Sequence, residues 1–443
     1  MSASDRPPPP GTWKAARAVK SAIVSPIQQI LAIEAASGVL LMVATAIALF
    51  LANSLWAHDF EALWHMPIGF SIGGHEFERS LHFWINDGLM TIFFFVVGLE
   101  IRREIFEGEL QTFRRAALPL AAALGGMLVP AIIYVAFNAG KAGSAGWAIP
   151  MATDIAFAVG VLTLLGSRVP NTLRVLLLAL AVIDDIGAIV IIAIFYSGGL
   201  ELYGFGIAAV GLAGAFAMRA AGVRQPLLYL APGLLVWAGM YIGGIHPTLA
   251  GVILGLATPV LPWFGPSGFA ETTRTQLEGL DENDRHALLH RLDAINAARK
   301  EAVSPVERLI HALHPWVAFV IMPVFALANA GVSFGGADLS GDAFWIFVGI
   351  VAGLALGKPI GIAGMALLSS RVGIGSRPPE MKPNGVVLVG VVGGIGFTMS
   401  LFIAQLAFKD PALLDTAKLG ILVGSACAMV IGLGLGRLLK KPA

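Results

Sequence analysis

Long apolar runs alternate with short polar connections along most of the chain, from about residue 30 to residue 437. Twelve of these runs approach or exceed the roughly 20 residues that a helix needs to cross a bilayer. Their approximate limits are 30–53, 81–100, 116–138, 147–166, 171–197, 203–219, 226–243, 245–261, 309–330, 343–369, 384–408 and 412–436. The pattern predicts an all-α polytopic membrane protein, in which residues 30–437 form one domain of twelve transmembrane helices.

Two segments inside this domain depart from the apolar pattern, and two short tails flank it. Residues 66–80, MPIGFSIGGHEFERS, alternate apolar and polar side chains around a central Gly-Gly pair, which predicts an external β-hairpin. Its edge offers a pairing site for a second copy of the chain, although a solvated hairpin explains the pattern equally well. Residues 265–308 predict a cytoplasmic segment with an amphipathic helix. Residues 1–29 and 438–443 are expected to be cytoplasmic tails.

Composition supports a membrane location and argues against several other classes of protein. Hydrophobic residues make up 57% of the 443 residues and charged residues only 13%, against about 25% charged in a soluble domain. The net charge of +1 gives no reason to expect a nucleic-acid partner. The single cysteine, Cys427, leaves no disulfide framework or cysteine-based metal site, and we expect no cofactor.

The positions of Lys and Arg predict the orientation in the membrane. If the N-terminus is cytoplasmic, 24 of the 29 basic residues fall on the cytoplasmic side. Four fall outside, namely Arg79, Lys141, Lys409 and Lys418. An excess of Lys and Arg marks the cytoplasmic side of a membrane protein. Twelve spans then place both termini in the cytoplasm.

The remaining cation, Lys358, and three carboxylates, Asp154, Asp184 and Asp185, lie deep inside apolar runs. A charged residue near the centre of a membrane helix costs about 2.5–3.5 kcal/mol, so these residues must pair, bind a proton or face water. Ion pairs that only fix helix packing would explain one Asp and one Lys. Three carboxylates cannot all be neutralised by one ammonium, so at least one of them needs a proton or an external cation.

The adjacent aspartates Asp184 and Asp185 project about 100° apart on a helix. One of them can therefore meet Lys358 while the other faces a cavity. A carboxylate in a cavity binds either a proton or a hard monovalent cation, but not both at once. Mutual exclusion at one site is the central requirement of an exchange mechanism. Geometry alone leaves open which aspartate takes which part.

Two of the predicted helices are interrupted. The run at 147–166 begins WAIPMATDIAF, where Pro150 removes a backbone donor, and the run at 384–408 contains VGVVGGIGFTMS with four closely spaced glycines. These runs are the middle members of two triplets that match in length and begin on opposite sides of the membrane. Such inverted repeats with interrupted, crossing helices predict a binding site near the midplane. Asp154 is placed to offset the positive half-helix ends there, and Lys358 the negative ones.

Several motifs give the chain a close resemblance to the bacterial NhaA-type sodium/proton antiporters over about residues 30–437. They occur in order and in the expected spans. The motifs are LHFWINDGLMTIFFFVVGLEIRRE, GWAIPMATDIAFAVGVLTLLGSRVP, ALAVIDDIGAIVIIAIFY, HPTLAGVILG, HALHPWVAFVIMPVFALANAGVS, GKPIGI and GIGFTMSLFIAQLAF.

The resemblance implies a role for each buried charged residue. Asp185 corresponds to the family's ion-binding aspartate, where Na⁺ or Li⁺ binds, and Asp184 corresponds to its neighbour. That neighbour pairs with the membrane lysine, here Lys358. Asp154 and Thr153 match the residues that help to shape the ion site at the broken fourth helix.

The resemblance also implies an activity. Family members export Na⁺ or Li⁺ from the cytoplasm in exchange for a larger number of entering protons, so that transport is electrogenic and serves pH and sodium homeostasis. They lie in the bacterial inner membrane, usually as homodimers joined through a hairpin that corresponds to residues 66–80. The protein is then a transporter rather than an enzyme, with lipid, Na⁺, Li⁺ and H⁺ as its partners.

Family members are activated by alkaline pH through ionisable residues at a cytoplasmic funnel. Glu100, Arg103 and Glu104 stand at the matching end of the second span, and His311 and His314 are further candidates. An interfacial cluster with its charged ends in water explains the first three residues equally well.

The chain departs from the family pattern at two places. Ile310 stands where the family carries a glutamate, and the segment at 265–304 is longer than usual. These departures concern the pH profile rather than the exchange chemistry.

Other classes of function explain the buried charges less completely. An intramembrane aspartyl protease needs its aspartates on separate helices, typically in a Gly-x-Gly-Asp pattern, and leaves Lys358 unexplained. A cation channel uses carboxylates without strict coupling, but a fixed ammonium would repel passing cations. A uniporter or symporter with the same fold is the closer alternative.

Overall fold

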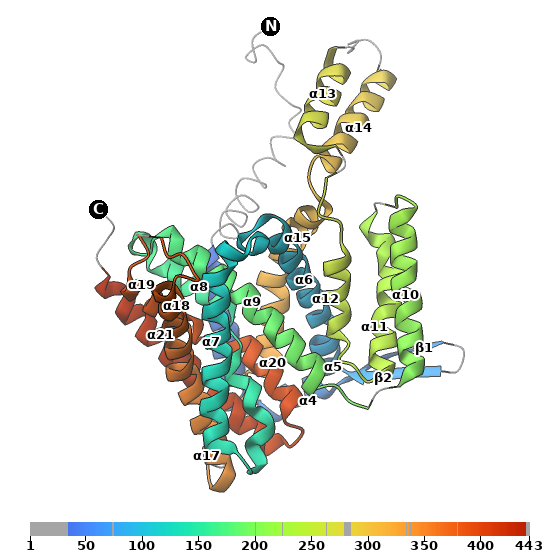
Figure 1. Cartoon of the computed structure of the whole chain (residues 1–443). Coiled ribbons are helices and arrows are strands. Elements are labelled where there is room, and N and C mark those ends of the chain that lie inside the picture. The colour runs from blue at the N-terminus through green and yellow to red at the C-terminus, as the bar shows by residue number, and fades with distance from the viewer. Residues whose placement is uncertain are drawn as a thin grey trace, which may run out of the picture.

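The computed structural model describes residues 34–439, apart from 73–74, 200, 224, 263, 279–284, 334, 336–338 and 379. The predicted N-terminal tail and residues 440–443 lie outside the described residues. The described part is almost entirely helical and contains one two-stranded sheet (Figure 1).

Each of the twelve apolar runs falls on one helix or on consecutive helices. The runs formed by one helix are α3 (Glu34–Ala52), α7 (Phe113–Asn138), α9 (Asn171–Phe195), α10 (Leu202–Ala220), α12 (Thr248–Ala257) and α21 (Pro411–Leu438). The composite runs are α5–η3–α6 (Leu81–Phe83, Trp84–Leu89, Met90–Glu107), η7–α11 (Pro226–Tyr229, Leu230–Ile242), α15–η8–α16 (Pro305–Trp316, Val317–Ile321, Met322–Asn329) and α17–η9–α18 (Gly341–Ala352, Gly353–Gly357, Lys358–Val372). The interrupted runs are η5 (Ala142–Met151) with α8 (Ile155–Leu164), and α19 (Pro383–Gly393) with α20 (Phe397–Ala407).

The apolar helices identify a multi-pass membrane protein. Among the described residues, seven helices are long and apolar enough to cross a membrane, or up to ten if each bent pair of helices counts as one span. Two shorter apolar helices occupy 226–242 and 248–257. The predicted total of twelve spans therefore depends on whether the bent pairs and the short helices cross the membrane.

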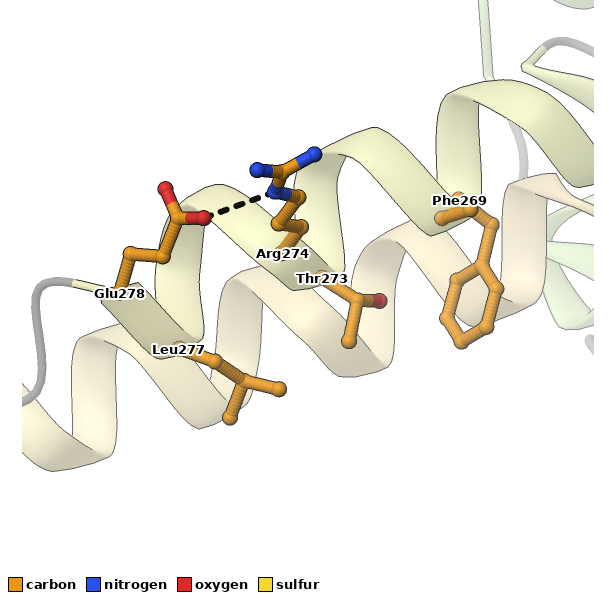
Figure 2. Close-up of a pocket in the computed structure, with 6 residues that line it drawn as sticks. Phe269, Thr273, Arg274, Leu277 and Glu278 are labelled. Carbon is orange, nitrogen blue, oxygen red and sulfur yellow. Dashed lines mark hydrogen bonds and ion pairs between the residues drawn. The ribbon is translucent and has the colours of Figure 1, made fainter.

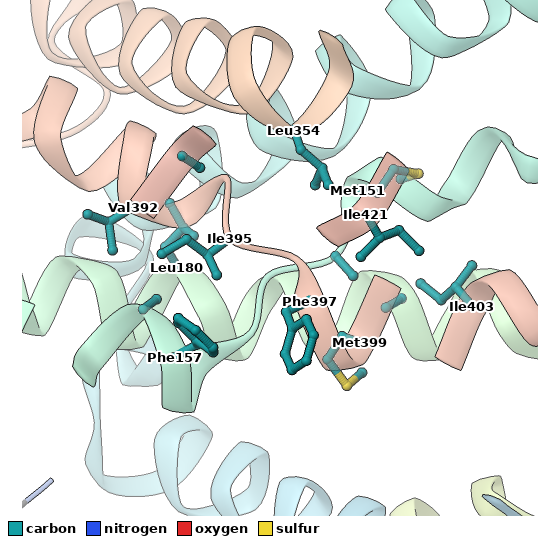
Figure 3. Packing of buried hydrophobic residues seen from close by; sticks show 14 of the residues in the cluster. Met151, Phe157, Leu180, Leu354, Val392, Ile395, Phe397, Met399, Ile403 and Ile421 are labelled. Atoms are coloured by element: carbon teal, nitrogen blue, oxygen red, sulfur yellow. The ribbon is translucent and has the colours of Figure 1, made fainter. Parts of the chain in front are cut away.

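The two interrupted runs break at the places where backbone-breaking residues were noted in the sequence. Residues 152–154 separate η5 from α8, with a bend of 47°, and residues 394–396 separate α19 from α20, with a bend of 45°. Pro150 lies inside η5, which is a 3-10 helix rather than an α-helix. In Figure 3 the two extended breaks run past each other among buried apolar side chains, which include Leu180 of α9 and Ile395.

Three of the described spans contain a wider π-helical turn, namely η3, η8 and η9. Such turns are frequent at functional sites because they change the direction in which the following side chains point. The turn η9 ends directly before Lys358, and η3 contains Asn86 and Asp87.

Helix α18, which begins with Lys358, lies directly against α7. A Cβ atom added to Gly361 would lie 2.0 Å from the carbonyl oxygen of Gly125, so only glycine permits this backbone contact. Small residues allow membrane helices to approach closely in this way. The contact fixes α18 beside α7 and so helps to place Lys358 inside the molecule.

A β-hairpin is present where the alternating pattern predicted one. Strand β1 (Pro67–Ile72) pairs antiparallel with β2 (His75–Ser80), with Phe70 opposite Phe77. Arg79 holds the hairpin to α11, since its Nε and Nη2 atoms lie 2.9 and 2.7 Å from the Tyr241 hydroxyl.

Two helices, α13 (Gly265–Glu278) and α14 (Arg285–Glu301), project from the helical bundle at the end opposite the strands (Figure 1). The sequence predicted one amphipathic helix in this segment, whereas the structure has a pair. Phe269, Thr273 and Leu277 line one side of α13, beside an exposed ion pair between Arg274 and Glu278 at 2.7 Å (Figure 2).

Candidate functional site

Asp154 joins the two interrupted runs at their breaks. Its Oδ1 atom accepts a hydrogen bond from the Phe157 amide at 3.0 Å and so caps the N-terminus of α8. Its Oδ2 atom accepts from both the amide and the hydroxyl of Thr398, in the first turn of α20; the amide bond is 3.2 Å long. A helix N-terminus carries partial positive charge. One buried carboxylate therefore neutralises the positive ends of two half-helices.

The negative ends of the half-helices are also satisfied by side chains. The Thr153 hydroxyl donates to the carbonyl oxygen of Gly393, the last residue of α19, at 2.9 Å. The Ser400 hydroxyl donates to the Ile149 carbonyl near the end of η5 at 2.8 Å. The Asp154 amide itself donates to the Ile395 carbonyl at 2.7 Å. The backbone groups that the breaks expose are thus bonded across the pair.

Lys358 links this junction to α9. Its Nζ atom lies 2.5 Å from the Thr153 hydroxyl and 2.6 Å from Asp184 Oδ2. The Lys358 side chain is completely buried, and Asp184 is 2% exposed. The Thr153 hydroxyl thus connects the ammonium to the C-terminal carbonyl of α19 through two hydrogen bonds. The structure thus brings Lys358, Thr153 and Asp184 into direct contact.

Asp185 is in a different position from Asp184, although both are buried on α9. It is 3% exposed and makes no hydrogen bond or ion pair with any residue that the structure describes. The Oδ1 atom of Asp184 is also without a hydrogen-bond partner in the described part of the chain. The site therefore combines a paired carboxylate with a neighbouring carboxylate whose oxygens remain available to an ion or a proton.

The candidate pH-response residues lie on two helices that pack together, α6 and α15. Glu100, Arg103 and Glu104 are half-buried near the end of α6, and Glu104 Oε1 accepts from the Glu109 amide at 2.7 Å. His311 and His314 are exposed on α15.

Ile310, the departure from the family pattern, belongs to the interface between these two helices. It is buried in a cluster with Leu99, Val260 and Val306. An apolar side chain therefore occupies this position between α6 and α15, where the resemblance had led us to expect a carboxylate.

Sequence reasoning assigned no role in the site to two residues that hold the junction together. Thr398 binds Asp154, and the Ser425 hydroxyl on α21 accepts from the Phe397 amide at 3.2 Å. Hydroxyl residues are ordinary components of membrane helices, so neither stands out in the sequence. The available signal for Thr398 was its position directly after the glycine-rich break. The first amides of the helix that begins there need acceptors from outside the helix, so a buried carboxylate such as Asp154 was to be expected beside them.

Interrupted apolar helices that meet around buried, partly unpaired ionisable residues define a secondary transporter of the membrane. The comparisons with known proteins agree with this class. The model of the family described as "Na+/H+ antiporter 1" matches residues 28–435.

Several relatives match this chain over nearly its whole length. It is 53% identical to "Na(+)/H(+) antiporter NhaA 2" of Sorangium cellulosum, over 100% of this chain and 96% of that protein. It is 52% identical to the Myxococcus xanthus protein of the same name, over 97% of this chain and 92% of that protein. It is 50% identical to "Na(+)/H(+) antiporter NhaA" of Bordetella petrii, over 94% of this chain and 91% of that protein. The chain belongs to the NhaA family of Na⁺/H⁺ antiporters.

Proposed function

We propose that the protein exports Na⁺ or Li⁺ from the cytoplasm in exchange for protons, with Asp185 as the ion-binding carboxylate. The observation that carries this proposal is the contrast on α9, where Asp184 is paired with Lys358 at 2.6 Å and the adjacent Asp185 has no partner among the described residues. A dehydrated Na⁺ needs oxygen ligands, and an unpaired carboxylate offers them together with a full charge.

Competition at this site would produce exchange. Na⁺ binds ionised Asp185, and protonation of Asp185 releases it, so the two ions cannot be carried together. A second proton is carried by the Asp184–Lys358 pair, whose contact changes as Lys358 gains or loses its proton. Two protons entering for each Na⁺ leaving would move net charge, which makes the transport electrogenic.

We further propose that all twelve apolar runs span the bacterial inner membrane, with both termini in the cytoplasm. The excess of Lys and Arg on one side supports this orientation. In this arrangement the runs at 116–197 and 343–436 form inverted repeats, and their interrupted members cross near the midplane. The hydrogen bonds between the two breaks support a crossing there.

Two other features extend the proposal. The β1–β2 hairpin supports a homodimer, because its outer edges leave backbone groups available to a second copy.

Glu100, Arg103 and Glu104, with His311 and His314, are proposed to set the dependence of the exchange rate on pH. The replacement of the usual carboxylate by buried Ile310 predicts that this dependence differs from that of relatives that carry it.

The test uses inside-out vesicles that contain the protein and a fluorescent probe of the pH gradient. Respiration first acidifies the vesicle interior. Added NaCl or LiCl should then dissipate the gradient in vesicles with the unaltered protein, and Asp185→Asn should abolish the response. Asp59→Asn, the same change at an exposed carboxylate, is the matched control and should retain full exchange.

Two results would contradict the proposal. Intact exchange in Asp185→Asn would remove Asp185 from the site, and a response to Na⁺ without proton movement would exclude antiport. Electrogenicity is tested separately by clamping the membrane potential with K⁺ and valinomycin. An exchange rate that ignores the imposed potential would contradict a net movement of charge.

A further inference from the structure

Three side-chain amides, two of them buried and one half-buried, form a cluster away from the candidate ion site. Asn86 lies in the π-helical turn η3, Asn329 ends α16, and Gln405 lies in α20, the second half of an interrupted run. Asn329 is completely buried, and Asn86 is 7% exposed. The three residues come from three different spans and are separated by at least 76 positions in the sequence.

The amides are joined in a closed ring of hydrogen bonds. Asn86 Nδ2 donates to Gln405 Oε1 at 2.7 Å, Gln405 Nε2 donates to Asn329 Oδ1, and Asn329 Nδ2 donates to Asn86 Oδ1 at 2.9 Å. His82 Nε2 also lies 2.8 Å from Asn329 Oδ1. Each amide in this amide ring therefore uses its oxygen as an acceptor and its nitrogen as a donor within the ring.

An aromatic layer lies next to the amide ring and comes from the same three spans. The Phe402 ring, one turn before Gln405 on α20, lies 5.3 Å from the Phe94 ring and 6.3 Å from the Phe325 ring, measured between centroids. All three aromatic side chains are almost completely buried. Phe325 precedes Asn329 by one helical turn on α16. The amide ring and the aromatic layer thus close the same interface between α20 and two other spans.

This interface lies on one side of the candidate ion site. Gln405 follows Thr398, the Asp154 partner, by seven residues, which is about 10 Å along an α-helix. Glu100 lies 14 residues beyond Asn86 in the same run, about 21 Å away toward the other end. In the proposed orientation the amide ring is therefore on the external side, and the Glu100 end is on the cytoplasmic side.

We propose that the amide ring, backed by the aromatic layer, is the external barrier of the transport path, and that it holds α20 against α16 and η3 while the ion site is closed to the outside. This inference rests on the proposed antiport function, because alternating access requires one side of the site to be sealed. To open this side, α20 must separate from the two other spans and break the ring.

The chemistry of the amide ring suits a reversible barrier. Amide side chains are neutral, so they neither trap a passing cation as a carboxylate would nor repel it as an ammonium would. Because every ring oxygen already accepts a hydrogen bond, the closed ring leaves each oxygen with at most one lone pair for Na⁺. Once α20 moves away, the separated amides can be hydrated by water that enters the open path.

The test measures access to the ion site from each side of the membrane. Asp185→Cys in a Cys427→Ser background supplies a single thiol, and a membrane-impermeant methanethiosulfonate ammonium reagent labels it in right-side-out or inside-out vesicles. Gln405→Leu and Asn329→Leu each remove two ring bonds with little change in volume. We expect either substitution to speed external labelling about tenfold, which corresponds to about 1.4 kcal/mol. Cytoplasmic labelling should not increase.

Gln111→Leu is the matched control, because Gln111 is an exposed amide outside the ring, and it should leave both labelling rates unchanged. Unchanged external labelling in both ring variants would overturn the proposal. Equal acceleration from both sides would also overturn it, because that pattern reports general loosening of the fold. Labelling requires no transport, so this test can fail or succeed independently of the Na⁺ exchange assay.

Discussion

Two regions of the molecule bring helices close together in different ways: the junction of the interrupted runs, and the helix pair α10–α11. Helices α10 and α11 are continuous along their contact, and a Cβ atom added to Gly239 would lie only 2.3 Å from the Ala208 amide nitrogen. At the junction, by contrast, the helices stop and side chains fill the gaps. Asp154, Thr153 and Ser400 there bond to backbone groups of the facing segment.

The difference follows from where the backbone groups find partners. A continuous helix satisfies its own N–H and C=O groups, so α10 and α11 need only small residues to approach each other. An interrupted helix exposes such groups in a region without water, and each unsatisfied group costs several kcal/mol there. Polar side chains are therefore required at the junction, and the same side chains belong to the candidate ion site. In this protein the breaks in the helices and the candidate site coincide.

The largest expected effect is the loss of the buried ion pair at the junction. Lys358→Met leaves Asp184 without its partner, and removal of one member of a buried pair typically destabilises a protein by about 3–5 kcal/mol. We expect a lower unfolding temperature in detergent and no Na⁺-driven proton movement. The double variant Asp184→Asn/Lys358→Met should recover most of the stability but not the exchange. A single variant as stable as the unaltered protein would show that the pair does not hold the junction.

A smaller effect is expected from loss of the double cap. Asp154→Ala leaves the first turns of α8 and α20 without their acceptor, and each lost cap is worth about 0.5–2 kcal/mol. Stability should fall, and exchange should slow by about an order of magnitude because both half-helices lose their anchor. Asp154→Asn keeps an oxygen for the Phe157 amide, so its stability and exchange rate should lie between those of the unaltered protein and those of Asp154→Ala. An exchange rate equal to that of the unaltered protein in Asp154→Ala would separate the cap from transport.

The smallest effect on transport is expected in the α10–α11 pair. Gly239→Ala forces the two helices apart, and overpacking of this kind costs about 1–3 kcal/mol. The unfolding temperature should fall while the exchange rate per folded molecule stays the same. Gly206→Ala, on the same helix pair, places its Cβ where nothing lies within 4 Å and should not destabilise the protein. Slower exchange in folded Gly239→Ala would mean that α10 and α11 take part in the transport movement.

The sequence was a good guide to the helices and to the charged residues. Apolar runs depend on composition alone, and each of the twelve predicted runs falls on helical segments. The interruptions near Pro150 and the glycine-rich stretch were also visible, because backbone-breaking residues act locally. Asp154, Asp184, Asp185 and Lys358 stood out because charges inside apolar runs are rare, and the family resemblance assigned their parts.

Features that depend on contacts between distant spans were not predictable. The amide ring joins residues as far as 319 positions apart, and Asn or Gln side chains near helix ends are common enough to draw no attention. The π-helical turns depend on packing against neighbouring helices rather than on a local motif. The 3-10 form of η5 and the first helix of the α13–α14 pair were also not predicted.

Because Asp154 caps both α8 and α20, it connects the two chain breaks at one point. The carboxylate belongs to the first interrupted run and binds the start of α20 in the second, so α8 and α20 share a pivot. Motion of α20 away from the amide ring can then occur as a rotation about its fixed end, which displaces Gln405, about 10 Å further along the helix. A single side chain in this way lets the centre of the molecule stay assembled while its outer edge opens.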